Sequence, residues 1–141
     1  MREGKGIFYY NEGGKYIGEW HQNKMHGKGV LYYPNNSIAY DGEWREDRLA
    51  GRGTLYNEEV SQLELPFDYS NWEAVEDYWV KYEGAFNDDS KNGKGRLYLS
   101  NGEVFEGSFK DDLVWGEGVL TRKDGSALRG LWRENKLIKL F

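Results

Sequence analysis

A short pattern of aromatic residues and glycines recurs along the chain and restricts the folds that it can adopt. Each copy has an aromatic residue, a glycine two positions later and another aromatic residue two further on, and a Gly-x-Gly starts 11 residues after the first aromatic residue. The first halves are Tyr16-x-Gly18-x-Trp20, Tyr40-x-Gly42-x-Trp44, Tyr82-x-Gly84-x-Phe86, Phe105-x-Gly107-x-Phe109 and a variant copy, Leu128-x-Gly130-x-Trp132. The glycine pairs are Gly27 with Gly29, Gly51 with Gly53, Gly93 with Gly95 and Gly116 with Gly118, and a further pair, Gly4 with Gly6, opens the chain. This periodicity predicts stacked repeats whose core consists of these rings and glycines.

The composition agrees with a repeat built from strands. The 141 residues suffice for one domain of ordinary size. Aromatic residues make up 16% of the chain, and 19 glycines accompany only 2 prolines, which favours many short strands joined by tight turns. No apolar run approaches the ~20 residues of a membrane span, and the N-terminal residues lack the apolar segment of a secretory leader. We therefore expect a cytoplasmic protein.

The pattern also predicts the register of each hairpin, because side chains alternate between the two faces of a strand. We expect strands over 16–20 with 27–32, 40–44 with 51–56, 82–86 with 93–98, and 105–109 with 116–121. Pairing Trp20 with Gly27 places Gly18 opposite Gly29, so that the rings lie over bare backbone on one face. The residue two positions after each glycine pair is apolar and lies on that face: Phe8, Leu31, Leu55, Leu97 and Leu120.

The same register places charges opposite one another on the second face. It pairs Glu19 with Lys28, Glu43 with Arg52, and Glu83 with Arg96. A row of bases, Lys5, Lys28, Arg52 and Lys94, is also consistent with a surface that attracts anionic membranes. We favour cross-strand ion pairs over a membrane-binding row because glutamates neutralise these positions.

The pattern resembles the MORN (membrane occupation and recognition nexus) repeat, whose unit is roughly Tyr-x-Gly-x-Trp, a polar loop, Gly-x-Gly and an apolar strand. The resemblance covers residues 16–127 with four units, and a half unit lies at each end. It implies an all-β fold, a single-layer twisted antiparallel β-hairpin solenoid. We predict one MORN-repeat domain over residues 1–141, which consists of a half repeat (4–15), repeats 16–39, 40–81, 82–104 and 105–127, and a terminal half repeat (128–141).

An insertion near residues 57–81 interrupts the period. It carries a net charge of −6 against −5 for the whole chain, so the remainder is nearly neutral. Ser70 and Glu73 fit a capping box, which predicts a short helix over roughly residues 71–78. The many apolar residues of the insertion favour a flap docked on an adjacent hairpin, and a partner-binding or self-covering element is the alternative.

The sequence offers no set of residues for catalysis. The chain has no cysteine, and its two histidines, His21 and His26, lie in one hairpin without an acid in phase to orient them. The stretch at residues 87–95 superficially resembles a calcium loop but lacks the acidic ligand at its twelfth position. We therefore predict no enzyme activity, no catalytic residue, no cofactor and no metal ion.

The resemblance implies a scaffold, because relatives of this repeat act as adaptors in cytoskeletal, ciliary and membrane-contact assemblies. We expect a protein partner, a helical or extended segment bound along the sheet, and no nucleic acid. The aromatic residues that we expect to contact it are Tyr9, Tyr32, Tyr56, Tyr98, Trp72 and Trp79. The alternatives are a phospholipid or membrane-surface binding module, which the net acidity disfavours, and a regulatory subunit of an enzyme complex.

Overall fold

Eleven strands follow one another in sequence order across one antiparallel sheet. The structure is a computed structural model that describes residues 2–141. The only helix in this range is a short 3-10 helix, η1 (Trp72–Asp77). The strands are β1 (Gly4–Tyr9), β2 (Lys15–His21), β3 (Lys24–Tyr32), β4 (Ile38–Arg45), β5 (Arg48–Tyr56), β6 (Trp79–Asn87), β7 (Ser90–Leu99), β8 (Val104–Lys110), β9 (Leu113–Thr121), β10 (Ala127–Arg133) and β11 (Lys136–Leu140). The predicted all-β solenoid of one layer is confirmed.

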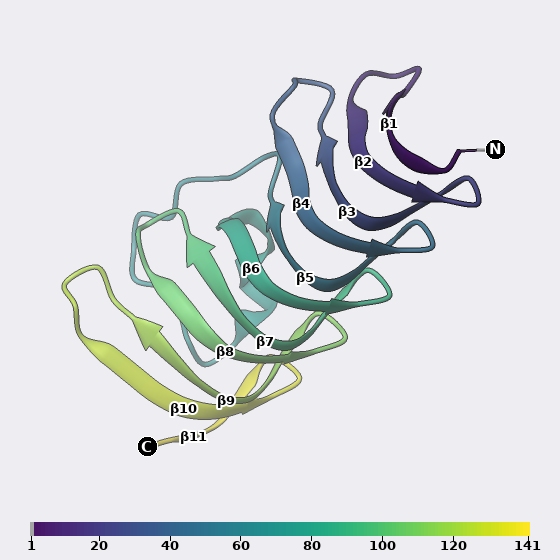
Figure 1. Cartoon of the computed structure of the whole chain (residues 1–141). Helices are drawn as coiled ribbons and strands as arrows, with labels where there is room; N and C mark the ends of the chain where they lie inside the picture. The colour runs from purple at the N-terminus through teal and green to yellow at the C-terminus, as the bar shows by residue number, and fades with distance from the viewer. Residues whose placement is uncertain (1) are drawn as a thin grey trace.

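The strands form curved hairpins that stack along one direction, with the two termini at opposite ends of the stack (Figure 1). Tight turns lie along one side of the stack, and the longer loops lie along the other side. Each tight turn has two residues with positive φ, such as Gln22 at 49° and Asn23 at 68°. Positive φ at both positions defines the type I′ turn, whose twist matches that of the flanking strands.

The predicted register is confirmed in the middle of each hairpin and wrong near its turn. Tyr16 pairs with Leu31 and Gly18 with Gly29, as expected, but Trp20 pairs with Met25. Gly27 instead pairs with Trp44 of the next hairpin. A β-bulge follows Gly18, and its extra residues include Gly27, whose φ of +76° favours glycine. Because of the bulge and the two-residue turn, β2 and β3 extend beyond the predicted 16–20 and 27–32.

The predicted ion pairs Glu19–Lys28 and Glu43–Arg52 are absent among residues 2–141. The carboxylate of Glu19 instead accepts a hydrogen bond of 2.6 Å from the backbone N–H of Lys28. Glu43 accepts the backbone N–H of Arg52 in the same way. These carboxylates therefore satisfy amide groups that the bulge leaves unpaired. Glu83 lies opposite Arg96 in the register, but the ion pair of Arg96 is with Glu106, at 3.4 Å.

The rings form one continuous zigzag row on the face of the sheet opposite to these charged residues. Tyr16 packs edge-on against Trp20 of its own hairpin and Trp44 of the next, with ring centroids 5.1 and 5.4 Å apart. The same contacts recur through Tyr40, Tyr82 and Phe105 to Trp132. The Tyr16 hydroxyl donates a hydrogen bond of 2.9 Å to the carbonyl of Glu19, and burial raises the pKa of Tyr16 to about 12. The rings thus join neighbouring hairpins into one core.

The glycines that the sequence assigns to the core differ in burial. Gly53 pairs with Gly42 as expected, and the Tyr40 ring lies so close over Gly53 that a Cβ there would overlap it. The prediction that Gly53 is a core residue is nevertheless wrong as regards burial, because Gly53 is only half-buried. The ring covers one side of its backbone, and a glycine has no side chain to cover the other side. Its equivalents in three other hairpins are buried: Gly29, Gly95 and Gly118.

The same correction applies to several other glycines of the predicted core. Gly51 and Gly93, each the first of its pair, are exposed because they lie in the bulge beside the turn. The half-buried ones are Gly18, Gly27, Gly42, Gly107 and Gly116. The rings are therefore the buried part of the repeat, and the glycines serve mainly to let the rings approach the backbone.

The predicted helix of the insertion is present but differs in type and start. It is the 3-10 helix η1, and its N-cap is Asn71, whose side chain accepts the backbone N–H of Glu73. Ser70 was predicted as the N-cap, but its hydroxyl donates to the carboxylate of Asp68. Asp68 therefore competes for Ser70 through a local turn, which leaves Asn71 to begin the helix.

Candidate interaction surface

The sheet has two chemically different faces. We call the side that carries the row of rings the aromatic face and the other side the polar face. Along the aromatic face, the residue two positions after each glycine pair is half-buried in the first hairpins (Phe8, Leu31 and Leu55). The equivalent residues Leu97 and Leu120 are 2% and 0% exposed. The same position of the repeat is therefore open to solvent at one end of the stack and covered at the other.

The cover is the insertion, residues 57–78, which we call the flap. Phe67 and Trp72 are 4% and 1% exposed. The ring centroid of Trp72 lies 4.6 Å from that of Phe67 and 4.6 Å from that of Phe105, and it also contacts Trp132. The prediction that the flap is docked is confirmed, but the prediction of an adjacent hairpin is wrong, because the anchors pack against Phe105 of β8 and Trp132 of β10. The flap crosses from the β7–β8 loop, where Ser100 binds it, to the β10–β11 turn, so it spans several hairpins.

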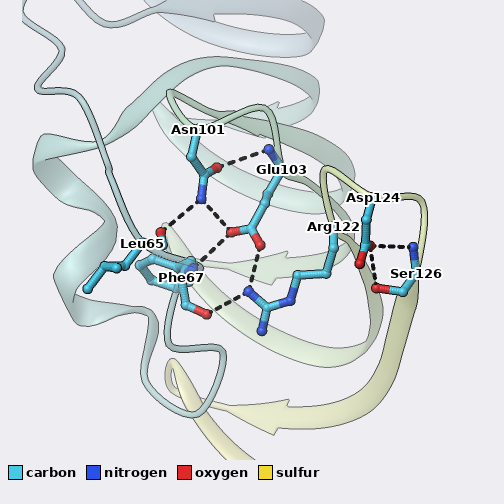
Figure 2. A network of polar contacts seen from close by, with 7 residues as sticks. All are labelled: Leu65, Phe67, Asn101, Glu103, Arg122, Asp124 and Ser126. Atoms are coloured by element: carbon cyan, nitrogen blue, oxygen red, sulfur yellow. Dashed lines mark hydrogen bonds and ion pairs between the residues drawn. The ribbon is translucent and has the colours of Figure 1, made fainter.

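A nearly buried ion pair holds the flap at its midpoint (Figure 2). The carboxylate of Glu103 accepts the backbone N–H of Phe67 at 2.9 Å and the Asn101 side-chain amide at 2.8 Å. Arg122 donates to Glu103 at 2.6 Å and to the carbonyl of Phe67 at 3.2 Å. The Asn101 amide also donates to the carbonyl of Leu65. Loops of two different hairpins thus bind the main chain of the same flap segment.

Glu103 differs from the residues at the equivalent position of the other loops. The backbone carbonyl of Glu103 accepts the hydrogen bond that closes its loop, and Gly14, Ser37 and Ser126 do so in theirs. At two of those positions the hydroxyl binds the side chain two residues earlier (Asn35 or Asp124). Among these residues, Glu103 is the one whose longer side chain forms a hydrogen bond with the flap. Burial raises the pKa of Glu103, but hydrogen bonds from Asn101, Phe67 and Arg122 and the charge of Arg122 outweigh it and hold the pKa below its usual value.

The tight turns carry a second set of contacts that the sequence analysis missed. The second turn residue of each hairpin exchanges two hydrogen bonds with the preceding hairpin. The Asp89 carboxylate accepts the backbone N–H of Leu49 at 2.7 Å, and the Asp89 N–H donates to the Leu49 carbonyl at 3.0 Å. The same pair of contacts occurs at Asn23, Asp47, Asp112 and Asn135. A signal was present in the sequence, because each of these residues lies 7 positions after the first residue of its repeat.

The flap ends this series of contacts at the last hairpin. The N–H of Leu137 occupies the position at which the other hairpins donate to the next turn, and it donates to the carbonyl of Ser70. The N–H of Trp72 donates to the carbonyl of Asn135 at 2.8 Å. The flap thus supplies to β11 the contact that a further hairpin would supply.

We expect the substitution Asp89→Ala to destabilise the chain by about 1–3 kcal/mol, because the backbone amide of Leu49 loses its acceptor and alanine disfavours positive φ. Asp89→Asn is the matched variant, since Asn23 and Asn135 fill the same position, and it should retain most of the stability. Urea denaturation of both variants measures the difference. Equal losses would show that the turn hydrogen bond contributes nothing to stacking.

The predicted partner residues fall into three environments. Tyr9 is 69% exposed, and Tyr32, Tyr56 and Tyr98 are half-buried; all four lie on the polar face, because each follows a residue of the aromatic face. Lys15 lies over the Tyr32 ring and Lys81 over the Tyr98 ring. Trp72 belongs to the core beneath the flap and is inaccessible while the flap is docked. The predicted residues therefore do not form one surface.

Trp79 packs at the start of β6, beside a lysine that lies on the aromatic face. Lys91 occupies a position that is apolar in the other hairpins (Met25, Leu49, Val114 and Leu137). Its ammonium group lies 5.3 Å from the ring centroid of Trp79 and 5.6 Å from that of Tyr82. Burial lowers the pKa of Lys91, while the charges of Asp112 and Glu76 act in the opposite direction. The cation–π contact with Trp79 thus offsets part of the cost of burying the ammonium group of Lys91.

The polar face contains an open groove of about 860 Å³ over β5–β10. It lies where Ala85 and Ser108 occupy the positions that Glu19 and Glu43 have in the first hairpins. Both signs of charge line it: Arg52, Lys94, Arg96 and Arg129 together with Glu83, Glu106 and Glu117. Within residues 2–141, histidine, aspartate and glutamate form no group of three or more that could hold a metal ion.

Within residues 2–141, no helix is long and apolar enough to cross a membrane.

Comparison with known proteins identifies the repeat. A family model of the MORN repeat matches residues 1–15, 16–38, 40–57, 82–104 and 105–127. A comparison with curated proteins gives no match. The matched segments cover more than half of the chain and coincide with the hairpins that share the ring and glycine positions. MORN repeats are generally found in proteins that bind proteins or membranes. The chain belongs to the MORN-repeat family.

Proposed function

We propose that the chain is a non-catalytic interaction scaffold that binds a segment of a partner protein along its sheet. The partner is a helical or extended segment, and the chain serves as an adaptor or subunit of a larger assembly in the cytoplasm, of the cytoskeletal, ciliary or membrane-associated kind. The proposal that it is not an enzyme rests on the sequence, which offers no set of residues for catalysis.

One observation carries the proposal. The aromatic face is covered by the flap at one end and remains open over the first hairpins, where Phe8, Leu31 and Leu55 are half-buried together with Met25 and Leu49. A single-layer sheet has no second layer of its own to cover such a face. Apolar residues in a row, flanked by polar loops, are typical of surfaces that bind another protein.

Site-specific photo-cross-linking in cells tests this proposal. A photoreactive amino acid at Leu31 or Leu55 lies on the aromatic face, and the same amino acid at Val30 or Thr54 lies on the polar face of the same strands. We expect the first pair to capture one protein in common and the second pair not to capture it. Capture of that protein from the polar face alone would contradict the proposal. Mass spectrometry identifies the captured protein.

Membrane-surface binding is the second candidate, because the groove on the polar face contains Lys94 without a neighbouring glutamate in its own hairpin. Glu83, Glu106 and Glu117 in the same groove oppose it. A combined Lys28→Ala, Arg52→Ala and Lys94→Ala variant separates the two functions. At about 1 kcal/mol per basic residue, a lipid-binding protein loses about 3 kcal/mol, more than a hundredfold in affinity.

We expect no strong co-sedimentation of the unchanged chain with anionic vesicles, and we expect the triple variant to retain its protein partner within a few-fold. Co-sedimentation that the triple variant abolishes would assign the membrane function instead. A third candidate, a regulatory subunit of an enzyme complex, is a special case of the scaffold and would appear as an enzyme among the captured partners.

A further inference from the structure

The flap makes contacts with the aromatic face that resemble those of a bound peptide. Residues 61–72 include two aromatic anchors, Phe67 and Trp72, five positions apart, which insert among Phe105 and Trp132. Between and around these anchors, the flap binds through its main chain: Leu63, Phe67 and Trp72 donate backbone N–H groups to Ser100, Glu103 and Asn135, respectively. Aromatic anchors combined with main-chain hydrogen bonds are typical of the recognition of an extended peptide.

The docked flap is held by its two buried anchors and by hydrogen bonds to the loops and turns of the last hairpins, and much of its length is nevertheless exposed. Most residues from Glu58 to Pro66 are exposed, and Leu65 is 72% exposed. The main latch at the midpoint is the side chain of Glu103, which no other loop has at this position. The segment therefore combines two buried anchors with long exposed stretches, which is typical of regions that open locally while the rest of a protein stays folded.

One buried polar group beneath the docked flap has no hydrogen-bond acceptor among the described residues. The indole N–H of Trp72 is buried and donates no hydrogen bond to any described residue. By contrast, the indole N–H of Trp132 donates to the carbonyl of Tyr69 at 2.6 Å, and that of Trp44 donates to the carbonyl of Gly29. A buried donor without an acceptor lowers the stability of the docked state relative to a state in which water reaches it.

We propose that residues 61–72 are a displaceable internal ligand of the aromatic face, latched by Glu103, and that a partner segment with two aromatic anchors about five residues apart displaces them. This inference rests on the proposed function and adds a mechanism that regulates partner binding. Release of the flap uncovers Leu97, Leu120, Phe105 and Trp132, so that the open surface of the first hairpins extends along the whole stack. The flap thereby limits binding to partners that replace its own contacts.

Hydrogen–deuterium exchange of the intact chain tests whether the flap opens by itself. We expect the amides that bond to the sheet, those of Leu63, Phe67 and Trp72, to exchange at least tenfold faster than those of β4 and β8. We expect Glu103→Gln to accelerate them at least tenfold further without changing the strands. Glu106→Gln is the matched control, because its side chain is 66% exposed and its ion pair with Arg96 does not involve the flap. Exchange of these three amides only as fast as the strands would overturn the proposal, since the flap would then be a fixed part of the core.

A peptide experiment tests the internal ligand directly. In the variant, the five-residue loop 33–37 replaces residues 57–80, because both segments close their hairpins with the same backbone hydrogen bond. The probe is a synthetic peptide of residues 61–74. We expect it to bind this variant at least tenfold more tightly than the intact chain, and Phe67→Ala with Trp72→Ala in the peptide to weaken binding at least tenfold.

A folded variant that does not bind the peptide would also overturn the proposal. If the variant does not fold, the exchange experiment on the intact chain still decides the question. Either failure leaves the cross-linking result at Leu31 and Leu55 unaffected, so a failure of this inference is distinguishable from a failure of the proposed function.

Discussion

The variant Trp44→Ala is expected to lose about 3–5 kcal/mol of unfolding free energy, the range for removal of a large buried ring. Trp44 is 5% exposed and packs edge-on against Tyr16 and Tyr40, with ring centroids 5.4 and 5.1 Å apart. Its indole N–H donates a hydrogen bond of 3.1 Å to the carbonyl of Gly29. The substitution therefore leaves a cavity between two hairpins and a carbonyl without its donor.

Tyr32→Ala is the matched control on the same hairpin pair. Tyr32 is half-buried on the polar face, and the ammonium group of Lys15 lies 4.9 Å from its ring centroid. We expect it to lose only about 1 kcal/mol, as is usual for residues outside the core. Chemical denaturation of both variants gives the comparison. Similar losses would mean that the polar face contributes to the core as much as the aromatic face.

Gly29→Ala should have the second largest effect, because the new methyl group has no space. A Cβ at Gly29 overlaps the hydroxyl oxygen and Cζ of Tyr16 and lies only 2.5 Å from Cε1 of the same ring. The Tyr16 ring cannot withdraw, since it is 0% exposed and packs against Trp20 and Trp44. Overpacking of this kind costs about 1–3 kcal/mol, and we expect the upper end because a fixed ring is displaced.

Gly6→Ala is the control that the repeat itself provides. Gly6 is the second glycine of its pair, as Gly29 is, but no ring lies over it in the same way. A Cβ at Gly6 meets its nearest atom, Nε1 of Trp20, at an ordinary 3.6 Å. We expect Gly6→Ala to change the thermal midpoint little and Gly29→Ala to lower it by many degrees. A large loss in both variants would indicate that the glycines are required for backbone conformation, not for ring packing.

The parts of the fold that repeat were predictable because the same local chemistry recurs at each copy. The aromatic residues, the glycines beneath them and the apolar position after each glycine pair specify which face of a hairpin is buried, and one register satisfies all copies. The bulge near each turn was not predictable from alternation, because strict alternation places one residue opposite one, and no single side chain marks the bulge: it also occurs where Ala85 and Ser108 replace Glu19 and Glu43. The turn contacts of Asp47, Asp89 and Asp112 had a visible spacing, but their partners lie in the preceding hairpin.

The candidate site was less predictable than the fold. Tyr9, Tyr32, Tyr56 and Tyr98 were grouped by their outward direction, and the structure places them on the polar face, away from the open apolar row. The flap was expected to dock, yet nothing periodic in residues 57–78 indicates which hairpins it reaches. Its position depends on Glu103 and Arg122, which lie 36 and 55 residues after Phe67 in the chain.

The sequence by itself determined the hairpins, the ring row and the order of the strands, because each of these follows from contacts within a repeat or between adjacent repeats. The tertiary structure decided which part of the aromatic face is covered and which part stays open. That choice depends on a single non-repeated segment, whose two aromatic anchors and main-chain groups contact residues of the last three hairpins. A local sequence pattern does not specify such contacts, since they join residues that are distant in sequence and belong to no common period.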